Sequence, residues 1–162
     1  MNTHSIYSDK PTATENKSTR YIYIKVKNVS GIVNRISSLF RRRRYSLQEF
    51  SVDFNNDNTS NIVIVVDGEL FDIGQIVNQI TKIYDVLEAY DATYQKEMLY
   101  YSYFVDSEYE KIKGCSFSPI KAIKMDNIYK LIYHINVTER QELQDFLDKN
   151  GFTYKERLTT LF

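Results

Sequence analysis

The residues best suited to bind a small molecule lie in a short polar turn, Asn28-Val29-Ser30-Gly31. This turn separates a strand-like run, residues 21–26, from an apolar pattern of helical period, and its glycine can adopt backbone angles that other residues avoid. A strand-to-helix loop presents unpaired backbone N–H groups, and the helix dipole adds roughly half a positive charge there. A carboxylate, such as that of an amino acid, is therefore the natural ligand. Every strand–helix junction has free N–H groups, so the turn alone leaves an empty loop as the alternative.

Other reactive side chains do not combine into a catalytic site. Carboxylates near strand ends or turns come from Asp53, Asp67, Asp72 and Asp85, and none has a histidine or a nucleophile beside it. Cys115 lies in a Gly-Cys-Ser-Phe context that indicates a turn or strand start, where a cysteine is more often a small packing residue than a nucleophile. His4 and His134 are far apart in sequence and form no recognisable metal-ligand set. The sequence therefore predicts a protein without catalytic residues, metal or cofactor.

Composition indicates a folded protein without an obvious charged partner. The chain has 162 residues, 43% of them apolar, which is enough for one domain or two small ones. Its 21 basic residues balance 21 acidic ones, so net charge gives no reason to expect nucleic acid or an anionic membrane. A single cysteine excludes an internal disulfide. Because the sequence has neither a membrane-length apolar run nor a signal-peptide core, we expect a cytoplasmic location.

The run Arg41–Arg44 is the one local concentration of charge. Four consecutive residues of a helix point in directions about 100° apart, so they do not form one basic face. Arg43 continues the apolar stripe of the preceding helix and is expected to extend its charge to solvent, while the others favour the negative end of the helix. Three interpretations remain: a solvated helix end, which we favour, contact with an acidic partner, and contact with nucleic acid.

The first half of the chain has a regular order of elements. Strands are predicted at residues 21–26, 46–54, 61–66 and 85–94, and helices after Gly31 and at residues 70–84. The first helix has a stripe of Ile32, Ile36, Leu39 and Phe40. The turn formers of residues 55–60 predict an antiparallel hairpin between the second and third strands. The fold class is thus α+β, a ferredoxin-like βαββαβ unit whose four-stranded sheet carries both helices on one face.

The second half repeats this order less clearly. Strands are expected at residues 97–105, 115–125, 128–137 and 152–162, with a short helix at 106–113 and a longer one at 138–150. Thr138 and Gln141 have the spacing of a capping box, and Asn150-Gly151 is a helix stop. We predict a degenerate copy of the first unit with a shrunken first helix. The expected domains are therefore a disordered polar tail at 1–19, one unit at 20–95 and a second at 96–162.

A four-stranded sheet with helices on one face leaves its other face bare. Tyrosines and aliphatic residues alternate along the predicted strands of the first unit, and such a face is unfavourable in water. We expect the sheet to be buried or extended by a copy of itself or by another domain.

Residues 21–94 resemble the ACT domain, and more closely the small, regulatory subunit of acetohydroxyacid synthase (acetolactate synthase). The similarity begins with an N-x-x-G-[apolar]-[apolar]-x-R-[IV] pattern at residues 28–36. It continues through Leu39-Phe40, an R-R-x-[YF] pattern at 42–45, Ser51-Val52, Ser60, residues 62–65, Gln79-Ile80 and Asp85-Val86. A turn, a helix face and a helix-to-strand junction together make this a specific resemblance.

The resemblance implies a regulatory function. Members of this family dimerise through ACT domains, bind a thiamine-diphosphate-dependent catalytic subunit and confer feedback inhibition by valine or another branched-chain amino acid. The resemblance carries the effector contacts onto Asn28, Gly31, Ile32 and Val33, and onto Ser46 where the family has an asparagine. It implies a homodimer, no nucleic-acid or membrane partner and no cofactor of its own.

Three departures from the family pattern bear on this expectation. Family members have glycine before the tyrosine and asparagine after it, where this chain has Arg44 and Ser46. Serine is shorter than asparagine and lacks an amide, so weaker or altered effector binding is expected. The third departure is the second half, which aligns with the family only in its general order of elements. The alternative is a free-standing amino-acid-sensing or structural ACT protein without a synthase partner.

Overall fold

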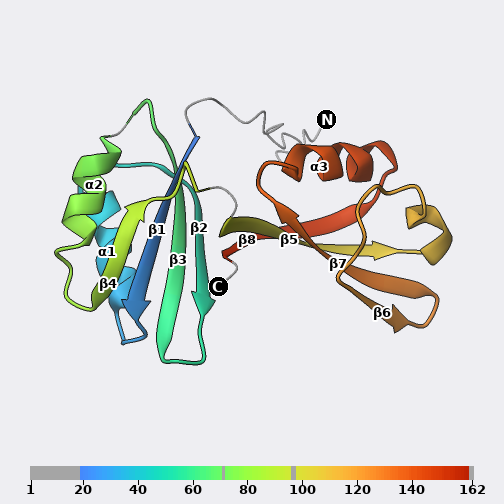
Figure 1. The fold of residues 1–162 in the computed structure, drawn as a ribbon, viewed down its shortest axis with the longest axis horizontal. Coiled ribbons are helices and arrows are strands. Elements are labelled where there is room, and N and C mark those ends of the chain that lie inside the picture. Colours follow the sequence, from blue (N-terminus) through green and yellow to red (C-terminus); the bar gives the residue numbers. More distant parts are fainter. Residues whose placement is uncertain (1–18, 71, 96–97, 161–162) are drawn as a thin grey trace, which may run out of the picture.

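A computed structural model describes residues 19–70, 72–95 and 98–160, which form two four-stranded antiparallel sheets (Figure 1). We call them sheet A, from the first half of the chain, and sheet B, from the second. The predicted polar tail lies outside the described residues except for Thr19, which begins the first strand.

Sheet A confirms the predicted βαββαβ order. Its elements are β1 (Thr19–Lys27), α1 (Ile32–Arg42), β2 (Leu47–Phe54), β3 (Thr59–Asp67), α2 (Ile73–Ile80) and β4 (Val86–Asp91). The strand order is β2-β3-β1-β4, and β2 and β3 form the predicted antiparallel hairpin. Both helices pack on one face of the sheet (Figure 1).

The core of the first half lies between sheet A and its helices. The predicted stripe on α1 is confirmed, because Ile32, Ile36, Leu39 and Phe40 are all buried. Alternate residues of β1 and β3, Ile22 and Ile64 among them, pack against that stripe. The predicted helix at 70–84 was too long at both ends: α2 begins after Asp72, whose side chain accepts a 3.0 Å hydrogen bond from Gln75 N, and ends at Ile80.

Sheet B repeats the same topology. Its elements are β5 (Leu99–Ser107), a 3-10 turn η2 (Tyr109–Ile112), β6 (Lys121–Met125), β7 (Ile128–Asn136), α3 (Arg140–Lys149) and β8 (Thr153–Thr160). The order β6-β7-β5-β8 is equivalent to that of sheet A. The first helix is reduced to η2, as predicted, and Cys115 and Phe117 pack against the core beyond it.

The predicted capping box at the start of α3 was wrong. The Thr138 hydroxyl and backbone N–H both donate to Asn136 Oδ1, at 2.7 and 3.0 Å, so the threonine closes a turn instead of capping the helix. The N-cap is Glu139, which makes no side-chain capping hydrogen bond. Asn136, two residues before Thr138, accepts the hydrogen bond of the threonine hydroxyl. The S/T-x-x-E/Q pattern cannot show this competition because it does not include Asn136.

The bare face of sheet A is covered by the second half of the chain. Tyr21, Tyr23, Val63 and Val65 point away from the helices, yet each is at most 4% exposed. They belong to a single apolar cluster with residues of sheet B, including Tyr101. Full burial of an apolar side chain contributes about 1.5–3 kcal/mol, so this contact stabilises the pair of sheets substantially. Of the two expected ways to bury this face, a copy of the sheet or another part of the chain, the structure shows the second.

Polar side chains of β2 complete the contact between the sheets. Among the described residues, no strand pairs with the outer edge of β8, and Leu158 and Thr160 present backbone groups there. Ser51 donates to the Leu158 carbonyl, while Glu49 and Asp53 accept from the backbone N–H groups of Leu158 and Thr160, each at 3.3 Å. These side chains satisfy an edge that would otherwise be open to strand pairing.

Candidate functional site

The loop between β1 and α1 has the geometry that the sequence predicted for an anion site. Gly31 has φ 79° and ψ 0°, a left-handed conformation that disfavours other residues. It is the N-cap of α1, and it provides no side-chain capping bond. No heavy atom lies within 4 Å of the position that a Cβ on Gly31 would occupy, so glycine is required here by its backbone angle and not by crowding.

Several N–H groups at this helix start have no acceptor. Within the part of the chain that the structure describes, none is found for the backbone N–H groups of Gly31, Val33 and Asn34. Ile32 N makes a long hydrogen bond of 3.3 Å to Val29 O. The positive end of the helix is therefore open on one side, which is the arrangement that binds carboxylates and phosphates.

Neighbouring turns hold the start of the loop in place. Asn28 N donates to Asn58 O and Lys27 N donates to Asp85 O, each at 2.9 Å. Both acceptor residues have positive φ, 60° for Asn58 and 78° for Asp85. Sequence reasoning did not assign these two residues a role, although an asparagine-rich turn and an aspartate at a helix-to-strand junction are signals for left-handed backbone.

Arg35 ties α1 to the same junction. Its guanidinium donates to the Asp85 carboxylate and to the Tyr84 carbonyl, each at 3.0 Å. The Asp85 charge is thus balanced by an arginine, which removes a source of repulsion for an anion near the loop. A second polar feature lies beside the loop: the Ser60 hydroxyl, opposite Val26 in the β1–β3 ladder, is buried without a hydrogen-bond partner among the described residues.

The structure brings most of the predicted effector residues together. Asn28 is exposed, and Val33 has 36% of its surface exposed, so an amide and an apolar side chain lie beside the open N–H groups. Ile32 differs from the expectation, because its side chain is 3% exposed and packs in the core under α1. Only its backbone can face a ligand.

Ser46 lies at the opposite end of sheet A from the loop. It precedes Leu47, which pairs with Val66, and Val66 pairs with Arg20 near the start of β1. The loop follows Lys27, seven residues further along β1, or about 23 Å at 3.3 Å per residue. Figure 1 shows the end of β1 and the start of β2 at opposite ends of the sheet. Ser46 and Gly31 of one chain therefore cannot contact the same amino acid.

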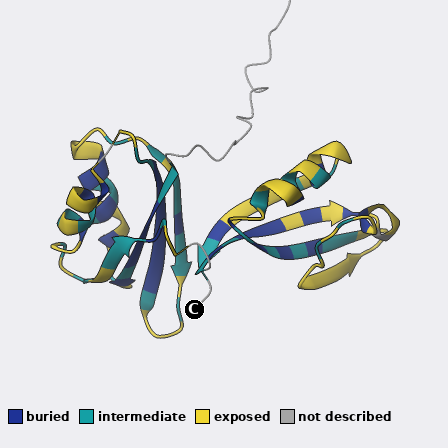
Figure 2. Cartoon of the chain, turned by 45° about the horizontal axis from the view of Figure 1, so that its top comes forward, coloured by how far each residue is buried: buried dark blue, intermediate teal, exposed yellow. Residues whose placement is uncertain are grey.

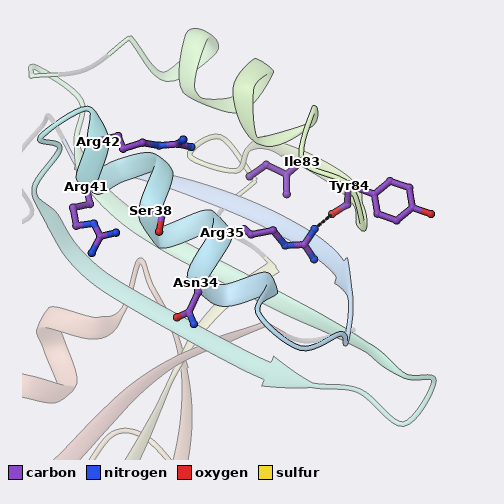
Figure 3. A pocket seen from close by; sticks show the side chains of 7 residues that line it. All are labelled: Asn34, Arg35, Ser38, Arg41, Arg42, Ile83 and Tyr84. Atoms are coloured by element: carbon purple, nitrogen blue, oxygen red, sulfur yellow. Dashed lines mark hydrogen bonds between the residues drawn. The ribbon is translucent and has the colours of Figure 1, made fainter.

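The outer side of α1 is hollowed between these two ends. One hollow of about 570 Å³ lies between α1 and the segment that precedes β4, and Figure 3 shows its lining side chains. They are Asn34, Arg35, Ser38, Arg41, Arg42, Ile83 and Tyr84. A second hollow of about 530 Å³ involves Asn34, Ser37, Ser38 and Arg41. Both are open grooves, so a second molecule would be needed to enclose a ligand there.

The arginine run ends α1 and does not form one basic face. Arg43 is the C-cap, and it lies exposed beyond the apolar stripe. Arg44 has φ 57°, the left-handed conformation that glycine prefers. Arg41 and Arg42 extend in different directions from the helix (Figure 3). Within the described ranges, none of the four is ion-paired with a carboxylate.

The described residues contain no group of three or more histidine, cysteine, aspartate or glutamate side chains that could hold a metal ion. None of their helices is long and apolar enough to cross a membrane.

The first half of the chain is similar in sequence to a known family of regulatory domains. Residues 22–88 match the AHAS small subunit-like ACT domain. The acetolactate synthase small subunit of Bacillus subtilis is 35% identical over 79 residues, 47% of this chain and 45% of that protein. Small subunit 2 of Arabidopsis thaliana, a chloroplastic protein, is 31% identical over 81 residues, 50% of this chain and 17% of that protein. Each alignment thus spans less than half of the relative's length.

A solved structure extends the comparison to the fold of both halves. The acetolactate synthase small subunit of Thermotoga maritima aligns with a TM-score of 0.62 over 89% of this chain and 98% of that one, at 18% identity. At that identity the likeness concerns fold, and it confirms two ACT-like domains in one chain. Residues 22–88 are thus similar in sequence to the ACT domains of acetolactate synthase small subunits, and both halves of the chain are similar in fold to the Thermotoga protein.

Proposed function

We propose that this protein is a cytoplasmic, non-catalytic regulatory subunit of acetohydroxyacid synthase that binds the catalytic subunit and a branched-chain amino acid such as valine. The observation that carries the proposal is the β1–α1 loop, which combines the family sequence pattern with a left-handed Gly31 and open N–H groups. The ACT-like domains are assigned to residues 20–95 and 96–162.

The loop would bind the amino acid by its carboxylate. The N–H groups of Gly31, Val33 and Asn34 donate hydrogen bonds to the carboxylate oxygens, and the dipole of α1 favours the negative charge. The amide of Asn28 supplies a further polar contact. The exposed Val33 is an apolar neighbour for a branched side chain, while Ile32 acts through its backbone and through the core packing that holds the helix start.

A second copy of the chain would complete the pocket. Ser46 and the loop are about 23 Å apart along one sheet. They can contact the same bound amino acid only if Ser46 comes from a second copy of the chain whose sheet runs in the opposite direction. A twofold homodimer provides this relationship twice, at two equivalent sites. The open grooves on the outer side of α1 agree with a pocket that is only half enclosed by one chain.

One observation favours a second candidate. The family model matches residues 22–88, the B. subtilis small subunit aligns with 47% of the chain, and Ser46 stands where the family has asparagine. The alternative function is therefore a free-standing amino-acid sensor or structural ACT protein with no synthase partner.

Thermal unfolding with added amino acids tests the effector site. A ligand held only by the folded dimer raises the melting temperature by mass action, so valine, leucine or isoleucine at millimolar concentration should shift the midpoint, and D-valine should not. The same protein should sediment as a dimer. A monomer with no shift for any of the three amino acids overturns the effector site.

Binding to the thiamine-diphosphate-dependent synthase encoded in the same genome separates the two candidate functions. The regulatory subunit should bind the purified synthase at micromolar concentration and raise its activity. An amino-acid-dependent shift without synthase binding would instead establish the free-standing sensor.

A further inference from the structure

Sheet B has a bare face of its own. Along each strand of sheet B, successive side chains point alternately to the face that carries α3 and to the opposite face, which faces solvent. The strand register places the solvent-side residues next to one another. Phe104 is opposite Ile132 and Lys155, Ile132 is opposite Lys121, and Ile123 is opposite Lys130. We call the solvent side of this sheet, away from its contact with sheet A, the open face of sheet B. Its apolar members are Phe104, Ile123, Met125, Ile128 and Ile132.

This open face is apolar at its centre. Four of its five apolar residues keep 37–56% of their surface exposed. All five residues of β6 are exposed, and Figure 2 shows the strand in the exposed colour. Contiguous exposed apolar surface of this kind marks interaction sites on soluble proteins.

Lysines interrupt the apolar residues. Lys121, Lys130 and Lys155 belong to the open face, and the only carboxylate that register places among them is Asp106, 3.8 Å from Lys130. Within the described parts of the chain, Lys121 and Lys155 have no ion-pair partner. A face with positive charge around apolar residues is complementary to a surface with carboxylates around apolar residues.

We infer that the open face of sheet B docks a carboxylate-rich, apolar-centred surface of the catalytic subunit. The inference rests on the proposed function, and it adds the surface, its chemistry and the residues that bind. The second half of the chain covers the bare face of sheet A, whereas the open face of sheet B is left uncovered by the described residues.

Charge and shape favour this occupant over two others. A second copy docked on the same face would bring three lysines against three lysines with one aspartate on each side, and like charges at an interface cost free energy. An anionic membrane requires apolar side chains that extend beyond their surroundings. Phe104, at 37% exposed, instead lies on β5 between β7 and β8.

Matched charge reversals test the assignment. Lys121 and Lys124 lie on the same short strand but on opposite faces, and both are exposed. The double variant Lys121→Glu/Lys155→Glu should weaken binding of the purified synthase subunit at least tenfold at low salt, with a smaller loss at high salt. The control Lys124→Glu should change the affinity less than twofold. Met125→Glu, which introduces a charge at an exposed apolar position, should also weaken binding.

One folding control accompanies the results that would overturn the inference. All variants should keep the melting temperature and the amino-acid shift of the wild type, which shows that the fold and the effector site are intact. If wild type binds the synthase and the double variant binds equally well, the docking surface is wrong while the proposed function stands. If wild type does not bind the synthase at all, both fail. If wild type associates from dimer to tetramer and the double variant does not, the face binds a second copy. If wild type binds phosphatidylserine vesicles and the double variant does not, the face binds a membrane. Either result overturns the inference.

Discussion

Arg44 and Gly151 occupy equivalent positions at the C-terminal ends of α1 and α3. Each is the second residue after its helix. The φ angle is 57° at Arg44 and 69° at Gly151. Each residue donates its backbone N–H to the carbonyl three residues earlier. In both helices the next residue donates to the carbonyl five residues before it, Tyr45 to Phe40 at 3.0 Å and Phe152 to Leu147 at 2.9 Å. This is the Schellman arrangement, which normally uses glycine.

Replacing Arg44 by glycine should therefore stabilise the protein. A non-glycine residue in the left-handed region costs about 1–2 kcal/mol, part of which is offset by the greater entropy of glycine in the unfolded chain. We expect Arg44→Gly to raise the free energy of unfolding by about 1 kcal/mol, measured by urea denaturation. The control Arg43→Gly, at a residue with φ −87°, should be neutral or destabilising. Equal gains from both variants would refute the explanation.

Gly31→Val should remove the effector response. Valine at φ 79° is strained, and it resists the conformation that directs the loop N–H groups outward. Since the space around Gly31 is open, the effect acts through the backbone angle. The variant should lose at least 1 kcal/mol of stability and show no shift of melting temperature with valine. An unchanged shift would separate the amino-acid response from this loop.

Ser46→Asn should strengthen effector binding if a second copy contributes this residue. The asparagine amide offers donors and an acceptor that serine lacks. A larger melting-temperature shift at fixed valine concentration is expected for the dimeric variant. Gln48→Asn, two residues further on at an exposed position, is the control and should leave the shift unchanged. If Ser46→Asn has no effect, Ser46 does not belong to the pocket.

Tyr101→Phe should weaken the contact between the two sheets. The Tyr101 hydroxyl donates to Glu49 Oε2 at 2.8 Å across the interface, while its ring lies 4.0 Å from the Arg140 guanidinium. Phenylalanine keeps the ring contact and removes only the hydrogen bond, so about 1–2 kcal/mol of unfolding free energy should be lost. Tyr100→Phe, the neighbouring position on the other face, should cost less. Equal losses would mean that the bond to Glu49 contributes little.

Alkaline pH should destabilise the fold through its buried tyrosines. Burial raises the pKa of Tyr133 to about 12, with a further contribution from Cys115, and burial likewise raises the pKa of Tyr23 to about 12. An unfolded tyrosine titrates near 10. The stability contributed by the protonated hydroxyls is thus complete below about pH 10 and is lost as pH rises towards 12.

The melting temperature measured against pH checks this dependence. Tyr133→Phe removes one of these buried hydroxyls, so its alkaline loss should be shallower than that of wild type. A flat profile from pH 9 to 11 would contradict the predicted direction.

Local pattern was sufficient for the order of the elements and for the backbone conformation of the loop at Gly31. The stripe on α1, the β2–β3 hairpin, the reduced first helix of the second half and the left-handed Gly31 all depend on residues close in sequence, and the structure agrees with each. Where local signals compete, the prediction was less accurate. Asn136 took the hydroxyl that a capping box would have used, and Asp72 set the start of α2.

The arrangement of the two sheets depended on contacts that no local pattern contains. Alternation in the first half predicted a bare face, but only tertiary structure showed that Tyr21 and Val63 are buried against the second half. Likewise, Ser46 was assigned to the same pocket as Gly31 by resemblance, and strand register places them at opposite ends of sheet A. Period and turn chemistry determine which residues share a face, whereas which surfaces meet depends on long-range packing between segments that are distant in the chain.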